Sequence, residues 1–362
     1  MNDQTKALID RLEATHTLSL EEYAYLVEHQ TEQAAAYAAQ RAFAVRTQIY
    51  GTDVYIRGLI EISSVCANDC YYCGLRRSNR RCQRYQLTQE EILDCCREGY
   101  RLGFRTFVLQ GGENAVYSVE DICQVVRSIK GAFPHCAVTL SLGEFPRGAY
   151  QAMREAGADR YLLRHETADP DHYRLLHPPE MSFEARMDAL HHLHDLGFQT
   201  GCGFMVGSPH QTPRTLAKDL KFVEVFQPEM CGIGPFIPQK DTPFRDAPPG
   251  TAEQTCYLLS LLRLIKPNLL LPATTALGTI RPDGRERGLA AGANVVMPNL
   301  SPLPVRKKYA LYDGKICTGD EAAQCIHCLS RRVASVGCRL VTARGDIIQT
   351  ASDRKSEALP LL

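Results

Sequence analysis

Residues 54–73 read VYIRGLIEISSVCANDCYYC, and the interpretation of the whole chain starts from this stretch. Its first half is rich in β-branched and apolar residues, which is typical of a buried strand. Its second half places Cys66, Cys70 and Cys73 within eight residues. Three thiols in so short a loop can hold either a zinc ion that needs a fourth ligand or an iron–sulfur cluster with one iron left open. We favour the cluster because no fourth ligand is apparent nearby, and we do not expect the basic segment around Cys82 to supply one.

A repeating pattern of strands and helices begins at residue 54. Short apolar runs alternate with amphipathic helical segments about eight times over roughly 250 residues, and capping signals at Thr88, Thr212 and Thr251 mark three helix starts. Such alternation predicts a parallel sheet, and eight units at this length favour a closed (β/α)8 TIM barrel. We expect an N-terminal helical extension over residues 1–50 and the barrel over 51–300. A barrel-closing segment with a C-terminal helical cap is expected over 301–362.

Composition excludes several classes of partner. Lys and Arg together number 41, as do Asp and Glu, so no net charge attracts nucleic acid or an anionic membrane. Charged residues interrupt the first twenty positions, which argues against a signal peptide, and no later window is apolar enough for a membrane span. We therefore expect a cytoplasmic protein whose 15 cysteines are not disulfide-bonded.

Polar segments follow the predicted strands, where a barrel places its active-site loops. Because these loops share one end of the barrel, we expect them to face a common cavity. Any one of these polar segments, taken alone, would be interpreted as an ordinary turn. They are the Cys66 loop, Gly111-Gly112-Glu113 and the segments 141–144, 164–166, 207–209 and 274–275.

The cysteine loop, with the aromatic Tyr72 directly before its last cysteine, resembles that of the radical S-adenosylmethionine (radical SAM) superfamily. The resemblance implies a 4Fe-4S cluster on Cys66, Cys70 and Cys73, whose open iron is chelated by S-adenosylmethionine. It also implies reductive cleavage of that molecule to a 5′-deoxyadenosyl radical. Gly111-Gly112-Glu113 is similar to the superfamily's GGE segment, which binds the methionine amino group.

Longer segments narrow the resemblance to the HydE-type FeFe-hydrogenase maturases, relatives of biotin synthase and methylornithine synthase. These segments are residues 160–167, 232–238, 272–276, 292–299 and 309–317. The resemblance implies two sets of residues around the cavity. The set for S-adenosylmethionine comprises Tyr72, Gly111, Gly112, Glu113, Thr139, Ser141, Glu166 and Arg186. The set for the substrate comprises Gln110, Arg164, Thr274, Thr275, Tyr309 and Tyr312. For Glu166 and Arg186 the alternative is a surface ion pair, and for the two tyrosines it is packing beneath the barrel-closing segment.

A second group of cysteines, Cys317, Cys325 and Cys328, is similar to an accessory iron–sulfur site in some HydE-like proteins. The resemblance implies a peripheral site, which we expect to hold a 2Fe-2S or incomplete cluster. The alternative is three cysteines in a C-terminal helical segment that bind no metal.

The function implied is anaerobic assembly of the diiron subsite of the hydrogenase H-cluster. The implied substrate is an organometallic iron species that carries carbonyl, cyanide and cysteine. Implied partners are other hydrogenase maturases and an electron donor such as ferredoxin or flavodoxin. Two alternatives stay open: a methylornithine synthase or biotin-synthase-like enzyme, and a non-catalytic iron–sulfur scaffold or carrier.

Overall fold

A parallel six-stranded sheet forms most of a barrel wall in the computed structural model, which describes residues 1–113, 116–319 and 326–350. All pairings in this sheet are parallel, and strands that follow one another along the chain lie side by side. This arrangement requires a crossover between each pair of strands, which the alternating helices provide. The strands of the sheet are β2 (Gly58–Ser63), β3 (Thr106–Gly111), β4 (Ala137–Ser141), β5 (Arg160–Leu162), β6 (Gln199–Cys202) and β8 (Met230–Cys231).

Two short segments complete the ring between β8 and β2. Met230 bridges in parallel to Leu270, and Pro272 bridges to Val295 of β10 (Val295–Val296). The backbone N–H of Leu59 then donates to the carbonyl of Pro298 over 3.0 Å, which closes the circle. The predicted parallel barrel is therefore confirmed, although its last two positions are bridged segments rather than long strands.

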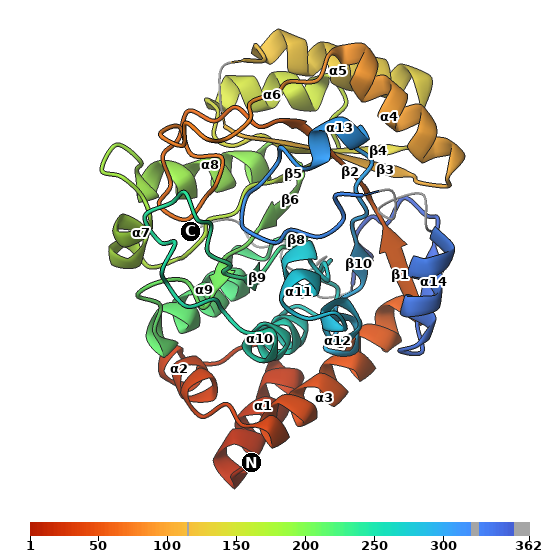
Figure 1. The fold of residues 1–362 in the computed structure, drawn as a ribbon. Coiled ribbons are helices and arrows are strands. Elements are labelled where there is room, and N and C mark those ends of the chain that lie inside the picture. The colour runs from red at the N-terminus through yellow and green to blue at the C-terminus, as the bar shows by residue number, and fades with distance from the viewer. Residues whose placement is uncertain (114–115, 320–325, 351–362) are drawn as a thin grey trace.

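Helices surround this wall, as Figure 1 shows. The predicted caps at Thr88 and Thr212 both form, each side chain accepting from the backbone N–H three residues later. Thr251 caps its helix in the same way. The helices are α4 (Gln89–Arg101), α5 (Val119–Ala132), α6 (Arg147–Glu155), α7 (Pro170–Leu176), α8 (Phe183–Asp195), α9 (Pro213–Phe226), α10 (Ala252–Ile265), α11 (Thr275–Ile280), α12 (Gly284–Ala290) and α13 (Leu303–Arg306).

Three N-terminal helices precede the barrel, as predicted: α1 (Asp3–Thr15), α2 (Leu20–Glu28) and α3 (Glu32–Tyr50). They pack below α9 and α10 in Figure 1, and Leu12 and Tyr23 are buried in the same core as the barrel helices. No helix in the described parts of the chain has the length and apolarity needed to cross a membrane.

The C-terminal segment contains both a helix and a strand, where only a helical cap was predicted. Helix α14 (Ile326–Ala334) is followed by β11 (Arg339–Val341), which pairs with β1 (Asp53–Ile56). Asp346 then accepts a hydrogen bond from the buried guanidinium of Arg160 over 2.6 Å. This segment therefore packs against the amino end of β5. The remaining short strands, β7 (Met205–Val206) and β9 (Gly234–Pro235), pair with each other beyond the carboxyl ends of β6 and β8.

Candidate active site

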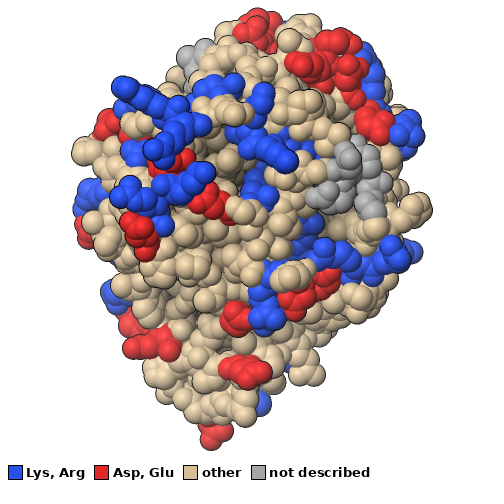
Figure 2. All heavy atoms as spheres, viewed as in Figure 1, with Lys and Arg blue, Asp and Glu red and all other residues tan. Residues whose placement is uncertain are grey.

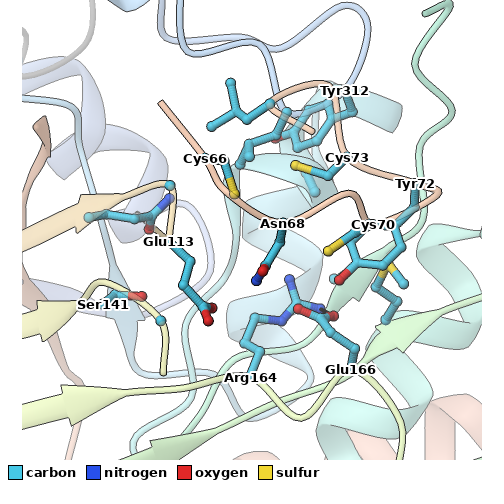
Figure 3. Close-up of a pocket in the computed structure, with 18 of the residues that line it drawn as sticks. Cys66, Asn68, Cys70, Tyr72, Cys73, Glu113, Ser141, Arg164, Glu166 and Tyr312 are labelled. Atoms are coloured by element: carbon cyan, nitrogen blue, oxygen red, sulfur yellow. Dashed lines mark ion pairs between the residues drawn. The ribbon is translucent and has the colours of Figure 1, made fainter. Parts of the chain in front are cut away.

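A cavity of about 300 Å³ lies at the carboxyl end of the barrel strands. The three thiols of the cysteine loop, Glu113, Arg164 and Glu166 face the same space in Figure 3. The residues predicted for the cavity that do line it are Cys66, Cys70, Tyr72, Cys73, Gln110, Gly111, Gly112, Glu113, Ser141, Arg164, Glu166, Arg186, Thr274, Tyr309 and Tyr312. Most of the predicted site is thus brought together in one place.

The cysteine loop is held in shape by its own polar side chains. Asp69 accepts two hydrogen bonds from the guanidinium of Arg76, at 2.8 and 2.6 Å, and two more from Ser78. The Arg76 guanidinium holds the pKa of the Asp69 carboxyl well below its usual range, so this carboxylate is ionised at neutral pH. Arg84 donates to four backbone carbonyls of the same region, including that of Leu75. The loop is therefore pre-organised by its own sequence.

Burial raises the pKa of all three loop thiols. The pKa of Cys73 is raised to about 12, and those of Cys66 and Cys70 are also raised above the ordinary thiol value. The main cause is loss of hydration, to which the proximity of the thiols to one another adds. Thiolates are unfavourable here unless metal cations compensate their charge, and iron does this in an iron–sulfur cluster. These thiols fit such a cluster.

Glycine is required at position 112 because the backbone of the cysteine loop passes directly over it. A β-carbon at Gly112 would lie 2.2 Å from the carbonyl oxygen of Val65 and 2.8 Å from the β-carbon of Cys66. The backbone N–H of Ala67 donates to the carbonyl of Glu113 over 2.6 Å, so the two segments are also hydrogen-bonded. This packing explains why a Gly-Gly turn follows the strand next to the cysteine loop.

Glu113 lies in a pocket that Gly143 makes possible. Gly143 has a φ of +90°, and a β-carbon there would lie 2.2–2.4 Å from Glu113 side-chain atoms. Gly143 stands within the predicted loop 141–144, but it was not predicted as a site residue. A side chain at this position would displace the carboxylate from the cavity.

Arg186 of α8 lies between two carboxylates. Its guanidinium is 2.5 Å from Glu144 and 3.4 Å from Glu113. Burial acts to lower the pKa of Arg186, but the two carboxylates outweigh this effect and raise it, so the side chain stays charged. Arg186 is only 8% exposed, which contradicts the alternative of a surface ion pair. Glu144 stands in the predicted loop 141–144 but was not predicted as a site residue, and burial raises its pKa.

Arg186→Met should destabilise the protein by about 3 kcal/mol, because removing one partner of a buried ion pair leaves the other charge uncompensated. The free energy of unfolding in urea measures the change. Arg97→Met on α4 is the matched control, since Arg97 pairs with Glu90 and Asp94 at an exposed surface and should contribute less than about 1 kcal/mol. If the two variants lost the same free energy of unfolding, Arg186 would contribute no more to stability than an exposed arginine does.

Arg164 and Glu166 lie across the cavity from the three thiols (Figure 3). Their charged groups are 3.1 Å apart, yet Arg164 Nε and Nη2 and Glu166 Oε2 are buried without a hydrogen bond. Glu166 also has a φ of +65°, a conformation that L residues rarely adopt and that occurs often at functional sites. Buried polar atoms without partners normally have a ligand, so these atoms fit a polar cofactor or substrate.

Behind this turn lies a fully buried pair, His165 and Asp219, with His165 Nε2 3.4 Å from Asp219 Oδ1. Burial lowers the pKa of His165 to about 3, so the imidazole is neutral at pH 7, and burial raises the pKa of Asp219. Asp219 accepts a hydrogen bond from the backbone N–H of Ala168 over 2.5 Å. The pair therefore supports the backbone on both sides of Glu166.

The far wall of the cavity carries hydroxyl and amide groups. Gln110 donates to the hydroxyl of Tyr309 over 3.2 Å, and Thr274 caps α11 by accepting from the backbone N–H of Leu277. The buried ammonium of Lys315 pairs with Glu61 and donates to the carbonyl of Tyr309 over 2.9 Å. Lys315 thereby holds the segment that carries both tyrosines against the barrel wall. Tyr309 and Tyr312 thus line the cavity as well as pack under this segment.

Two predicted residues do not line the cavity, Thr139 and Thr275. Thr139 is buried in β4, two residues before Ser141 and so one layer deeper on the same face. Thr275 is the first residue of α11, directly after the capping residue Thr274, which does line the cavity. Lining residues that sequence analysis missed include Asn68, Leu75, Leu163, Met205, Phe236 and Leu311. Of these, Asn68 stands inside the cysteine loop, and Leu163, Phe236 and Leu311 stand inside the segments 160–167, 232–238 and 309–317 that carry the family resemblance.

The second cysteine group is described only in part. Cys317 is a free thiol with a φ of +62°, and its sulfur accepts a hydrogen bond from Arg285 over 2.9 Å. Cys328 lies in α14 and is disulfide-bonded, contrary to the expectation that no cysteine would be, and Cys325 lies outside the described residues. Across residues 1–113, 116–319 and 326–350, no three His, Cys, Asp or Glu side chains are arranged to share a single metal ion. The accessory cluster stays a prediction.

A parallel barrel with a Cys-x3-Cys-x2-Cys loop at its mouth defines the radical SAM class of enzymes, and a family model described as the radical SAM superfamily matches residues 60–223. The chain is also 47% identical over 293 residues to the FeFe hydrogenase maturase subunit HydE of Thermotoga maritima, which covers 81% of this chain and 83% of the relative. The chain therefore belongs to the HydE family of radical SAM enzymes. The resemblance found in the sequence motifs is confirmed.

More distant relatives share the same architecture. A 3-methylornithine synthase of Methanosarcina barkeri is 29% identical over 308 residues, 84% of each chain. The crystal structure of methylornithine synthase PylB superposes with a TM-score of 0.78 at 24% identity, over 92% of this chain and 97% of that one. The maturase HydG of Carboxydothermus hydrogenoformans superposes with a TM-score of 0.78 at 19% identity, over 98% and 81%. These two structures support the fold alone.

Proposed function

We propose that this protein cleaves S-adenosylmethionine reductively and acts in the assembly of the diiron subsite of the FeFe-hydrogenase active site. The proposed substrate is a small iron species that carries carbonyl, cyanide and cysteine ligands. The observation that carries the proposal is the cavity, in which three thiols, buried ion pairs and a wall of hydroxyl groups share one space. Membership of the HydE family supports it, because the relative from Thermotoga maritima is described as a hydrogenase maturase subunit.

Cys66, Cys70 and Cys73 would hold a 4Fe-4S cluster and leave one iron without a protein ligand. When bound, this cluster would supply the electron that breaks a sulfonium C–S bond of S-adenosylmethionine and yields a 5′-deoxyadenosyl radical. The Asp69–Arg76 pair fixes the loop before the cluster binds. Little reorganisation of the protein is then needed to form the site.

The groups proposed to bind S-adenosylmethionine lie beside the thiols. Glu113 suits an ammonium group, and Arg186 holds that carboxylate in place. Glu166 has a buried oxygen that makes no hydrogen bond and suits a ribose hydroxyl. Ser141 and Tyr72 line the same region, and His177 fixes Tyr72 through a 3.0 Å contact between its Nε2 and the tyrosine hydroxyl.

The substrate is proposed to lie between Arg164 and the far wall. The guanidinium of Arg164, whose Nε and Nη2 make no hydrogen bond, suits an anionic group such as a carboxylate or cyanide. Thr274, Tyr309 and Tyr312 would donate or accept hydrogen bonds around it. Apolar side chains such as Met205 complete the wall and limit water in the cavity. Thr275 is not part of this proposal because it does not line the cavity.

Anaerobic reconstitution tests the proposal. With dithionite, the reconstituted protein should convert S-adenosylmethionine to 5′-deoxyadenosine, and it should complete activation of an apo-hydrogenase in a mixture that lacks only this maturase. Failure to form 5′-deoxyadenosine would favour a non-catalytic scaffold. Formation of 3-methylornithine from lysine, or of biotin from dethiobiotin, would instead place the protein with its more distant relatives.

An accessory cluster on Cys317, Cys325 and Cys328 is proposed in addition. The free thiol of Cys317 and its contact with the guanidinium of Arg285 support a metal ligand at this position. Cys317→Ala should lower the iron bound per chain by about two atoms, the content of a 2Fe-2S cluster. It should leave the cluster at the barrel mouth intact, because Cys317 does not line that cavity. Unchanged iron content after reconstitution would contradict this second site.

A further inference from the structure

The cysteine loop is followed by nine residues, 76–84, that contain five arginines and no acidic residue, in a chain of zero net charge. We call this segment the arginine loop. Two of its arginines have structural roles, since Arg76 pairs with Asp69 and Arg84 donates to backbone carbonyls. The other three, Arg77, Arg80 and Arg81, are exposed. The side chains of these three arginines do not stabilise the cysteine loop, so their presence has another explanation.

The exposed arginines are weakly engaged. The side chain of Arg77 is 60% exposed beside Glu180, and that of Arg81 is 82% exposed beside Asp241. Exposed ion pairs of this kind contribute about 0–1 kcal/mol, so a partner's carboxylates can replace them easily. Arg80 makes no ion pair or hydrogen bond with any part of the chain that the structure describes. Lys240, next to Asp241, adds a further exposed cation.

The arginine loop is bonded directly to the cysteine loop. The backbone N–H of Arg77 donates to the carbonyl of Asn68 over 2.8 Å, and that of Arg76 donates to the carbonyl of Cys73 over 3.1 Å. Figure 2 shows Lys and Arg side chains gathered beside a hollow on the face of the molecule that carries the barrel mouth. A protein that binds the arginine loop would therefore lie close to the three thiols without entering the cavity.

We propose that the arginine loop is the docking surface for an acidic electron-transfer protein, of the class that carries a flavin or an iron–sulfur centre. This inference rests on the proposed function, in which the cluster must be reduced before each cleavage. One electron would pass from the reduced centre of the partner to the oxidised cluster, and the partner would leave oxidised by one electron. Complementary charge would speed the encounter and orient the partner. A substrate-delivering partner would have to open onto the cavity, whereas an electron donor needs only close approach.

The decisive variant is the triple substitution Arg77→Glu, Arg80→Glu and Arg81→Glu. The matched control is Arg97→Glu, Arg101→Glu and Arg127→Glu, which reverses three exposed arginines on α4 and α5. Binding of fluorescently labelled flavodoxin is measured by anisotropy at low ionic strength, with and without reconstitution. We expect the arginine-loop variant to bind at least tenfold more weakly and the control to bind as the wild type does. Arg80→Glu alone, which breaks no ion pair, should weaken binding about threefold.

Turnover separates this inference from the proposed function. With flavodoxin, its reductase and NADPH, 5′-deoxyadenosine formation by the arginine-loop variant should fall at least tenfold. With dithionite it should stay within twofold of the wild type. Equal flavodoxin binding by the variant and the wild type, or an equal loss in the control triple, would overturn the docking surface. Absence of 5′-deoxyadenosine from the wild type with dithionite would overturn the proposed function, and the binding measurement would still decide the docking surface.

Discussion

Cys70→Ala is expected to abolish S-adenosylmethionine cleavage, with 5′-deoxyadenosine at the background of a reaction without enzyme. The thiols of Cys66, Cys70 and Cys73 line one cavity, and the pre-organised loop presents no other cysteine there. Loss of one thiol would leave a second iron without a protein ligand, and a cluster held by two cysteines would not persist. Iron and sulfide content after reconstitution, the EPR spectrum of the reduced protein and 5′-deoxyadenosine by chromatography measure the loss.

Cys82→Ala is the matched control for this experiment. Cys82 lies nine residues after Cys73, and in the structure it does not line the cavity. The substitution should leave iron content and cleavage within twofold of the wild type, because the thiol is only partly buried and the change is small. Activity retained by Cys70→Ala, or lost equally by Cys82→Ala, would contradict the assignment of the three ligands.

The barrel and the cysteine loop could be predicted from local sequence because their signals are local. Capping residues such as Thr88 and Thr212 mark helix starts within a few positions, and the cysteine spacing is legible without any tertiary contact. The barrel closure at Leu270 and Pro272 was harder to define. These segments form single bridges, so an apolar run predicts their position but not their short length.

The missed parts of the site depend on contacts between segments far apart in the chain. Gly143 looks like an ordinary turn glycine until Glu113 is seen to occupy the space that its side chain would fill. Glu144 becomes significant only through Arg186 of α8, 42 residues later in the sequence. Thr139 was a reasonable prediction from strand alternation, which specifies the face of a strand but not the depth at which a cavity ends.

The basic character of residues 76–84 was visible in the sequence, but its division into two roles was not. Arg76 and Arg84 turn inward to a carboxylate and to carbonyls, whereas Arg77, Arg80 and Arg81 stay exposed. Only the structure separates the residues that build the cysteine loop from those that a partner could reach. Substitution of Arg77, Arg80 and Arg81 therefore tests partner binding, because these residues do not line the cavity.

Gly112→Ala is expected to lower the affinity for S-adenosylmethionine at least 100-fold. A β-carbon at this position would lie 2.2 Å from the Val65 carbonyl oxygen and 2.8 Å from Cys66 Cβ, so the backbone that carries the first thiol must move. Displacement of an active-site segment by about 1 Å can cost a factor of about 100. The same shift would strain the hydrogen bond from the Ala67 N–H to the Glu113 carbonyl, which aligns the cysteine loop with the carboxylate. Equilibrium binding of S-adenosylmethionine to the reconstituted variant measures the effect.

Gly111→Ala provides a control one residue away on the same turn. A β-carbon there would meet the side-chain atoms Leu142 Cδ2 at 3.3 Å and Ile62 Cγ1 at 3.5 Å, and the Ser63 carbonyl oxygen only at an ordinary contact distance of 3.6 Å. Neither glycine has a positive φ, so backbone strain is absent from both substitutions and only the steric contact differs. Binding by Gly111→Ala should therefore stay within about threefold of the wild type. If the two variants bound S-adenosylmethionine equally well, the cysteine loop would have to tolerate displacement. The close packing of Gly112 against Cys66 would then not be what aligns the cluster with Glu113.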